Sequence, residues 1–254
     1  MPGETDLHDL APTRGQRYRT QVHCLGDTAI AIDLRYRNGE PSERGKEQAM
    51  KAIRCRAWGA PDTLRLEEAE RPNLQPHQVR IRVRAAGVNF ADTLMVGGSY
   101  QVKPPFPFTP GLEAAGEVVE AGAAVDNLRA GQRVLAVLRS GGGYAEEIVL
   151  DAAAVVPIPA TMDFVTAAAF PVAYGTSHFA LTHRGHLQAG ETLLVLGAAG
   201  GVGLTAVEIG KAMGARVIAA AGSIEKLEVA RSRGADEADR LQNRKHPQPR
   251  ARSD

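Results

Sequence analysis

Alternation of apolar and polar residues is clearest in the middle of the chain, in the stretch QVRIRVRAAGV that begins at Gln78. Three β-branched residues fall on one face of this stretch and three arginines fall on the other. A period of two with β-branched residues predicts a half-buried strand. Similar short runs separated by glycines predict a small barrel-like β domain. These further predicted strands cover 115–120, 133–138 and 145–150.

Beyond Thr161 the pattern changes to segments of helical and strand character in turn. An alanine-rich stretch, 163–174, predicts helix with a break at Pro171. Alternating strands and helices then predict a parallel sheet, so the fold class is α/β with an all-β part. The predicted order is strand 192–196, helix 202–213, strand 216–221 and helix 224–233.

The two ends of the chain lack such patterns. Residues 1–49 are polar and irregular, except that 28–37 alternates weakly and could be a strand, and as a whole they predict a disordered extension. Met50, where order is expected to start, could itself be an initiator. The end of the chain, RLQNRKHPQPRARSD (240–254), is rich in basic residues and predicts a disordered basic tail, with no strand expected after Gly234.

Composition excludes several classes of protein. The formal net charge of +1 argues against a nucleic-acid partner. Two cysteines, Cys24 and Cys55, form no ligand cluster, and a disulfide framework is not expected. No apolar run is long enough to span a membrane, and the acidic first residues do not resemble a secretory signal. A cytoplasmic protein is expected.

A glycine-rich turn follows the strand predicted at 192–196 and opens the next helix. It reads Gly-Ala-Ala-Gly-Gly-Val-Gly over 197–203. Glycines let the backbone approach a pyrophosphate, and the free N–H groups of the helix start bind its charge. The alternative is a tight turn with no ligand, but the strand–turn–helix context favours nucleotide binding. The candidate cofactor-binding residues here are Ala198, Gly200, Gly201, Val202 and Gly203.

The end of the second parallel strand indicates which dinucleotide is preferred. The stretch AAAGSIEK lacks the acidic residue that would hold a ribose 2′-hydroxyl. Gly222, Ser223 and Lys226 suit a 2′-phosphate instead, which favours NADPH. Ser223 could simply cap the following helix, and Glu225 opposes the phosphate reading.

Residues 50–239 resemble the zinc-independent quinone oxidoreductases of the medium-chain dehydrogenase/reductase superfamily. The resemblance rests on RAAGVNFADTLMVGGSY, PFTPGLEAAGEVVEAG, GGGYAEEIVL, AAAFPVAYGTSHFAL and the segment around LGAAGGVG. It implies a GroES-like β-barrel substrate domain over 50–165 and an incomplete Rossmann NADPH-binding domain over 166–239. It also implies an active cleft between the two, in which NADPH delivers a hydride to a small-molecule quinone or activated enone.

The resemblance also assigns candidate residues. Zinc-dependent relatives carry Cys and His in the segments matching GVNFAD and PGLEAAG, whereas here Leu112 takes the histidine position and only Glu113 remains. One carboxylate cannot form a catalytic zinc site, so no metal is expected. Asn89 and Tyr100 would line the quinone end, and Thr176 would contact the cofactor. The alternatives are a turn residue, a rim aromatic and a helix-internal hydroxyl, respectively.

The chain departs from the family after residue 239. A complete Rossmann fold has six strands and this sequence predicts two, so a C-terminal truncation is expected. Strand 192–196 would then present an open apolar edge, and the family-typical homodimer is doubtful because the usual dimer edge is missing. A non-catalytic fragment or pseudoenzyme is therefore the alternative function, and an enoyl-reductase-like relative is a third.

Overall fold

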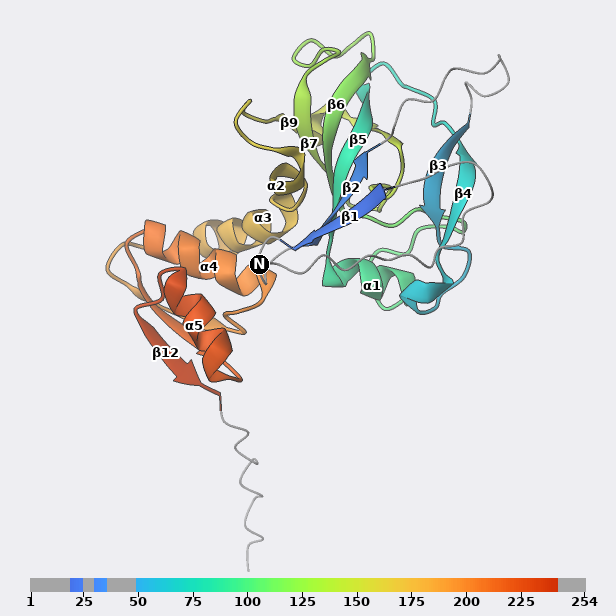
Figure 1. Ribbon diagram of the computed structural model, residues 1–254. Helices are drawn as coiled ribbons and strands as arrows, with labels where there is room; N and C mark the ends of the chain where they lie inside the picture. The colour runs from blue at the N-terminus through green and yellow to red at the C-terminus, as the bar shows by residue number, and fades with distance from the viewer. Residues whose placement is uncertain (1–18, 25–29, 36–48, 242–254) are drawn as a thin grey trace, which may run out of the picture. The chain divides into compact units, whose positions relative to one another are not determined.

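The computed structural model describes residues 19–24, 30–35 and 49–241 (Figure 1). It divides into two units, Met1–Gly175 and Thr176–Asp254, which are described separately below. The division falls inside one helix, α3 (Pro171–Phe179), whereas the sequence placed the domain boundary at 165/166.

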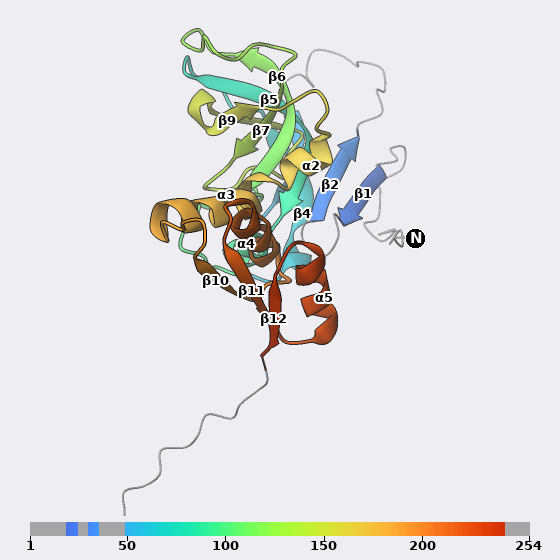
Figure 2. The same cartoon turned by 90° about the vertical axis from the view of Figure 1, so that its left-hand side faces the viewer.

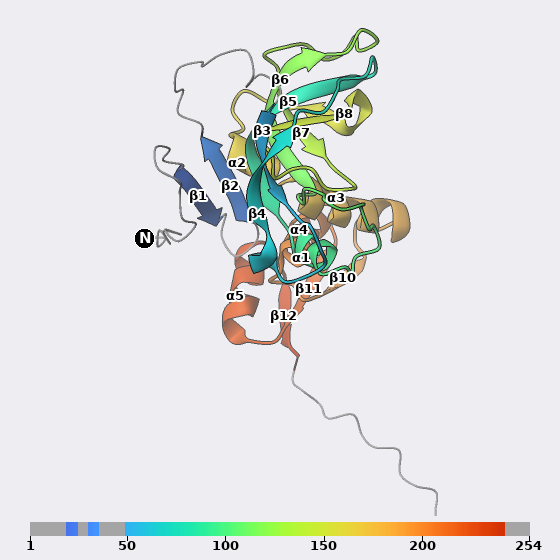
Figure 3. The same cartoon turned by 90° about the vertical axis from the view of Figure 1, so that its right-hand side faces the viewer.

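The first unit is organised around one long strand, β5 (Gln78–Val88), which pairs antiparallel with β2, β6 and β8. The sheet runs in the order β1-β2-β5-β6-β7-β9, with β8 on β5, and Figure 3 shows β1 outermost beside β2. This path does not return on itself, so among the described residues the predicted barrel is not closed. The other strands are β1 (Arg19–Cys24), β2 (Ile30–Arg35), β6 (Glu113–Ala121), β7 (Arg133–Val137), β8 (Glu147–Asp151) and β9 (Val155–Pro157).

The alternation in β5 has the predicted consequence for packing. Val79, Ile81 and Val83 are buried in the core of this unit, while Arg82 is exposed. The predicted strands at 115–120, 133–138 and 145–150 are confirmed, within a few residues, as β6, β7 and β8. Apolar side chains from these strands complete the core because each strand turns one face inward.

Smaller elements flank the sheet. Strands β3 (Ala49–Arg54) and β4 (Arg65–Glu70) form a separate antiparallel pair. Helix α1 (Phe90–Val96) follows β5 directly, and its Met95 and Val96 are buried. Helix α2 (Phe164–Ala168) packs on β5 and β6 through small alanines, and the predicted break at Pro171 separates it from α3.

The second unit contains a parallel sheet in the order β10-β11-β12 (Figure 2). Helix α4 packs on β10 and β11, and α5 packs on β11 and β12. Apolar residues of the strands and helices, among them Val195, Val207 and Val217, form its core. The bounds are β10 (Thr192–Leu196), α4 (Gly201–Ala212), β11 (Arg216–Ala221), α5 (Ile224–Ser232) and β12 (Glu237–Arg240), with a π-helical turn at Ala180–Arg184.

Strand β12 corrects the prediction that no strand follows Gly234, and it extends order to Arg240, the first residue of the predicted tail. The segment EADR was missed because it is polar and lacks β-branched residues. The position of this segment is fixed by contacts with neighbouring elements. Asp236 accepts from the backbone N–H of Val217 at 2.8 Å and pairs with Lys211, and Glu237 pairs with Arg216.

Part of the predicted N-terminal extension is also ordered. Strand β2 lies within the weak alternation at 28–37, and its backbone pairs with β5, with Ile30 opposite Val88. Strand β1 pairs with β2 in turn. The expectation of disorder over 1–49 therefore does not hold for these two strands. A strand within 28–37 was one of the alternatives, and it forms because β2 pairs with β5, while β1 forms by pairing with β2. The remainder of that extension, and residues 242–254 of the tail, lie outside the described residues.

Candidate functional site

Asn89 stands at the junction of β5 and α1. Its backbone is extended, and its N–H donates to the Asp92 Oδ2 at 2.8 Å. A carboxylate three residues into a helix that accepts from the N-cap backbone is one half of a capping box, so NFAD starts the helix locally. This cap fixes the Asn89 backbone, while its side-chain amide is left to make a longer-range contact.

That contact is with Glu113, the first residue of β6. Asn89 Nδ2 donates to Glu113 Oε1 at 2.8 Å, and the backbone N–H of Val172 donates to Glu113 Oε2 at 2.7 Å. Glu113 as a whole is only 2% exposed. Burial raises its pKa to about 7, against the two hydrogen bonds, which lower it. Gly87 gives the carboxylate room, since a Cβ there would lie 2.2 Å from Oε1.

A second buried carboxylate, Asp92, lies beside this pair. Its Oδ1 accepts from the Gly111 N–H at 3.1 Å, and its Oδ2 accepts from the Tyr144 hydroxyl at 3.0 Å. Burial raises the pKa of Asp92, and burial together with the nearby Asp92 charge raises the pKa of Tyr144. Gly111 has φ +102°, and a Cβ there would meet the Tyr144 ring. We call Asn89, Asp92, Glu113 and Tyr144 the polar network.

Tyr100 lies just beyond the other end of α1. Its backbone N–H donates to the carbonyl of Leu94 at 3.1 Å. The side chain is half-buried and packs against an apolar cluster that includes Met95, Phe108 and Leu112. Asn89 and Tyr100 thus flank α1, and only Asn89 belongs to the polar network. The ring of Tyr100 packs in this apolar cluster, and its hydroxyl is the group that can form a hydrogen bond with a ligand.

The glycine turn between β10 and α4 has the geometry that a nucleotide site requires. Gly197 has φ +64°, which favours glycine. A Cβ on Gly203 would lie 2.3 Å from the Gly197 carbonyl oxygen, so only glycine lets the helix start close to the turn. The first N–H groups of α4, from Gly201 to Gly203, have no carbonyl acceptor inside the helix.

The remaining residues of the turn differ in accessibility. Gly200 and Val202 are exposed. Ala198, in contrast, is fully buried, and its N–H already donates to the Ala220 carbonyl at 3.1 Å. In this conformation Ala198 ties the turn to β11.

At the end of β11, Gly222 and Lys226 are exposed and Ser223 is half-buried. Ser223 caps α5, accepting from the Lys226 N–H at 3.4 Å, and this leaves the Lys226 ammonium out in solvent. A hydrogen bond from Ser223 lowers the pKa of the exposed Glu225, so that carboxylate competes for the hydroxyl. Arg240 of β12 pairs with Ala221 of β11, which brings another cation to this corner. Arg240 could not be predicted from the sequence, because its position depends on β12, which was not predicted either.

Thr176 is exposed on α3, whereas the neighbouring Ser177 makes structural contacts. Ser177 is buried, donates to the carbonyl of Val202 at 2.7 Å and lies 2.8 Å from the Thr205 hydroxyl. This contact ties α3 to the first turn of α4. A small hydroxyl inside a helix gave no distinguishing signal in the sequence.

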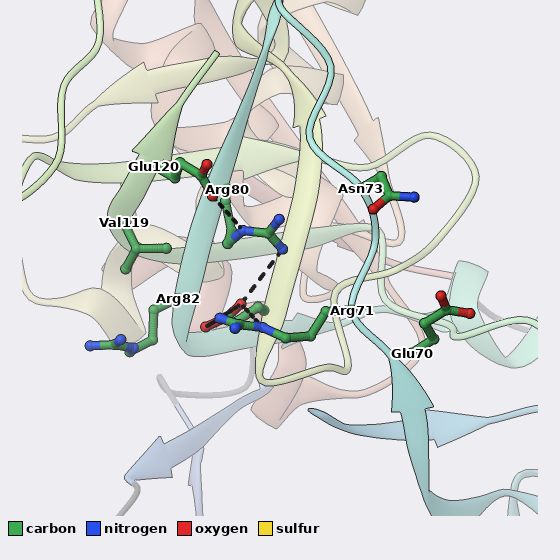
Figure 4. Close-up of a pocket in the computed structure, with 8 residues that line it drawn as sticks. Glu70, Arg71, Asn73, Arg80, Arg82, Val119 and Glu120 are labelled. Carbon is green, nitrogen blue, oxygen red and sulfur yellow. Dashed lines mark hydrogen bonds and ion pairs between the residues drawn. The ribbon is translucent and has the colours of Figure 1, made fainter. Parts of the chain in front are cut away.

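A cavity of about 400 Å³ lies elsewhere in the first unit, and no predicted site residue lines it (Figure 4). Its charges are largely paired with one another. Arg71 binds both oxygens of Glu147, at 2.6 to 2.9 Å, and Arg80 pairs with Glu120 at 3.1 Å. An ion-pair network of this kind does not suit an apolar quinone ring.

Two further findings concern the described ranges as a whole. No group of three or more His, Cys, Asp or Glu side chains there is arranged to hold a metal ion. No helix within those ranges has the length and apolar character needed to cross a membrane.

Comparison with known proteins agrees with this architecture. Residues 75–160 match the alcohol dehydrogenase GroES-like domain. The chain is 43% identical over 214 residues to the quinone oxidoreductase-like protein 2 homolog of Nematostella vectensis, covering 83% of this chain and 58% of that protein.

Solved structures give the same picture. A probable oxidoreductase from Mycobacterium abscessus superposes with a TM-score of 0.71 at 42% identity, covering 77% of this chain and 62% of that chain. The quinone oxidoreductase from Thermus thermophilus, also solved in complex with NADPH, has a TM-score of 0.66 at 39% identity and covers 74% and 59%. The chain thus spans about three-fifths of the length of these relatives. It is a homologue of the quinone oxidoreductases and contains the GroES-like domain of the medium-chain dehydrogenase/reductase superfamily.

Proposed function

We propose that the protein is an NADPH-dependent, zinc-independent reductase of quinones or activated enones. The observation that carries this proposal is the glycine turn between β10 and α4. Its left-handed Gly197, its Cβ-free Gly203 and the unsatisfied N–H groups of the helix start form a cradle that fits a pyrophosphate. A relative of this chain has been solved in complex with NADPH.

In this proposal the chain holds the cofactor at two places. The N–H groups of Gly201, Val202 and Gly203 bind the pyrophosphate, and the exposed Lys226 ammonium, with Ser223, binds the 2′-phosphate. The end of β11 is open at Gly222, where a Cβ would meet nothing within 4 Å. Thr176, exposed on α3, is assigned a cofactor contact on the resemblance.

NADPH, when bound, supplies the hydride, and the acceptor takes up one hydride and one proton to become a hydroquinone or a saturated ketone. The chain's own contribution is to hold the acceptor and stabilise charge on its oxygen. Asn89, through its side-chain amide, and Tyr100, through its phenol, are the proposed donors to that oxygen. Preorganised donors of this kind lower the barrier without a metal ion.

Zinc independence is supported by the donor set of this chain. The two segments in which zinc-dependent relatives carry Cys and His are joined here by the hydrogen bond between Asn89 and Glu113. Leu112, in the histidine position, is buried in an apolar cluster. An amide, a carboxylate and a leucine do not supply the three ligands that a catalytic zinc ion needs. The cytosol is the proposed compartment, since only two cysteines occur in the chain.

The test is oxidation of NADPH by the purified chain in the presence of 1,4-benzoquinone, with a simple cyclic enone and NADH as parallel arms. Turnover with NADPH above the no-protein control supports the proposal, and the preferred acceptor separates quinone from enone chemistry. NADPH binding without turnover of any acceptor would point to the non-catalytic alternative. Preference for NADH would mean that Glu225, and not Lys226, determines which cofactor is bound.

A further inference from the structure

We propose that Glu113 is a positioning residue for Asn89: its carboxylate fixes which way the Asn89 amide is turned and leaves the second N–H of that amide for the acceptor's oxygen. This inference rests on the proposed function for the role of Asn89, but its geometry stands on contacts inside the first unit. Glu113 itself is not placed in contact with acceptor or cofactor.

The first argument is the pattern of donors around the carboxylate. Oε1 accepts from Asn89 Nδ2 at 2.8 Å, and Oε2 accepts from the Val172 N–H at 2.7 Å. An ionised carboxylate can only accept, so the NH₂ end of Asn89, and not its carbonyl, must face Glu113. An amide with no such partner could turn by 180° and exchange its oxygen and nitrogen.

The second argument is that the backbone of β5 leaves space for this carboxylate. The backbone of β5 carries Gly87 at the contact, where a Cβ would lie 2.2 Å from Oε1 and 2.6 Å from Cγ of Glu113. Val172 stands in the first turn of α3, where backbone N–H groups lack helical acceptors. Glu113 is thus held between the start of α1 and the start of α3.

The third argument concerns protonation. Protonation of Glu113 would turn one accepting oxygen into an O–H group and remove the negative charge, which weakens the hydrogen bonds from the two N–H donors. The other titratable groups that face this site are Asp92 on α1 and the Tyr144 hydroxyl, which donates to Asp92. The orientation of the Asn89 amide should therefore depend on pH, with the ionised form of Glu113 holding it.

The test follows the side-chain NH₂ signals of Asn89 by nitrogen-15 NMR of the full chain, with the signals assigned by their loss in Asn89→Ser. In the wild type these signals should shift with pH in one transition. Glu113→Gln should displace them and abolish the transition. Glu147→Gln, which alters another buried carboxylate of the same unit, should leave them unchanged. Signals that are the same in Glu113→Gln as in the wild type would overturn the proposal.

A second variant serves if Glu113→Gln does not fold. Gly87→Ala keeps the charge of Glu113 but pushes against its carboxylate, so the Asn89 signals should move, and unchanged signals would again overturn the proposal. Kinetics distinguish this inference from the proposed function. In Glu113→Gln we expect kcat for quinone reduction to fall about 10- to 100-fold, because the donor is misplaced, while KM for NADPH stays unchanged. A wild type without turnover contradicts the proposed reductase, and the NMR experiment still decides the role of Glu113.

Discussion

The glycine turn between β10 and α4 is built from the backbone of consecutive residues, whereas the polar network is built from side chains of segments far apart in the sequence. The turn from Gly197 to Gly203 joins β10 directly to α4, and one backbone hydrogen bond from Ala198 holds it to β11. Glu113 contacts residues 24 and 59 positions away, and Tyr144 reaches Asp92 across 52 positions. Gly200 and Val202 of the turn are exposed, whereas the two carboxylates of the network, Asp92 and Glu113, are buried and Asn89 and Tyr144 are half-buried. A site built from the backbone of consecutive residues is therefore recognisable as a sequence motif, whereas a network of side chains from distant segments is not.

The largest effect is expected where the turn tolerates no side chain at all. In Gly203→Val the new Cβ would lie 2.3 Å from a backbone oxygen, which cannot move without disturbing the turn. We expect the second unit to lose about 1–3 kcal/mol or more of stability. NADPH binding, measured by fluorescence, should be lost together with it. Gly175→Ala, with nothing within 4 Å of its Cβ, is the control. Equal NADPH affinity in the two variants would show that the turn does not bind the cofactor.

The polar network should make the free energy of unfolding depend on pH. The folded pKa of Glu113, about 7, lies above the ordinary value of 4.5, so between these values the folded protein binds more protons than the unfolded chain. The stability contributed by the protonated group is complete below pH 4.5 and is lost as pH rises through 7. Denaturant melts should show this loss, up to about 3 kcal/mol, in the wild type and not in Glu113→Gln. Parallel pH profiles for the two proteins would count against a shifted Glu113.

Cofactor choice tests the exposed corner after β11. Lys226→Ala removes the ammonium proposed for the 2′-phosphate, so the affinity for NADPH should fall about tenfold while that for NADH stays the same. Titration calorimetry with both cofactors measures this difference. Glu225→Gln should act in the opposite direction, because it removes a competing carboxylate beside Ser223. Equal losses for NADPH and NADH in Lys226→Ala would exclude a specific phosphate contact.

The smallest effect is expected at the edge of the network. Tyr144→Phe removes one of the hydrogen bonds to Asp92 but keeps the ring, and the remaining N–H donors still satisfy the carboxylate. A loss of about 1 kcal/mol is expected from thermal or denaturant unfolding. Because Glu113 keeps both of its donors, the Asn89 amide should be undisturbed. A much larger loss would mean that the network acts as a single unit.

The sequence predicted those parts of the molecule whose cause is local. Strands β5, β10 and β11 follow from alternation or short apolar runs, and α4 and α5 follow from a glycine turn and a serine cap. Strand β12 could not be predicted, because its polar residues are placed by ion pairs to α4 and β11. Strand β2 pairs with the edge of β5, and β1 pairs with β2, so both depend on backbone partners that lie elsewhere in the sequence.

The candidate site was predicted unevenly for the same reason. The spacing of the glycines and of Ser223 predicts the nucleotide-binding turn and the helix cap directly. Asn89 and Tyr100 were predicted only from the resemblance to the quinone oxidoreductases. Glu113 was noticed as the remnant of a metal site, but its burial and its two partners depend on how β6 and α3 pack. The roles of Ser177 and Arg240 depend on their contacts with Val202 and Ala221, which the sequence does not show.

The close approach of Gly87 to Glu113 has a consequence for sequence variation. A Cβ at position 87 would overlap the carboxylate at position 113, so position 87 cannot accept a larger residue unless the side chain at position 113 becomes smaller or moves. Among related proteins, an alanine or serine at the equivalent of position 87 should accompany a shorter side chain at the equivalent of position 113. Such paired substitution would be an evolutionary record of the contact, readable without any structure.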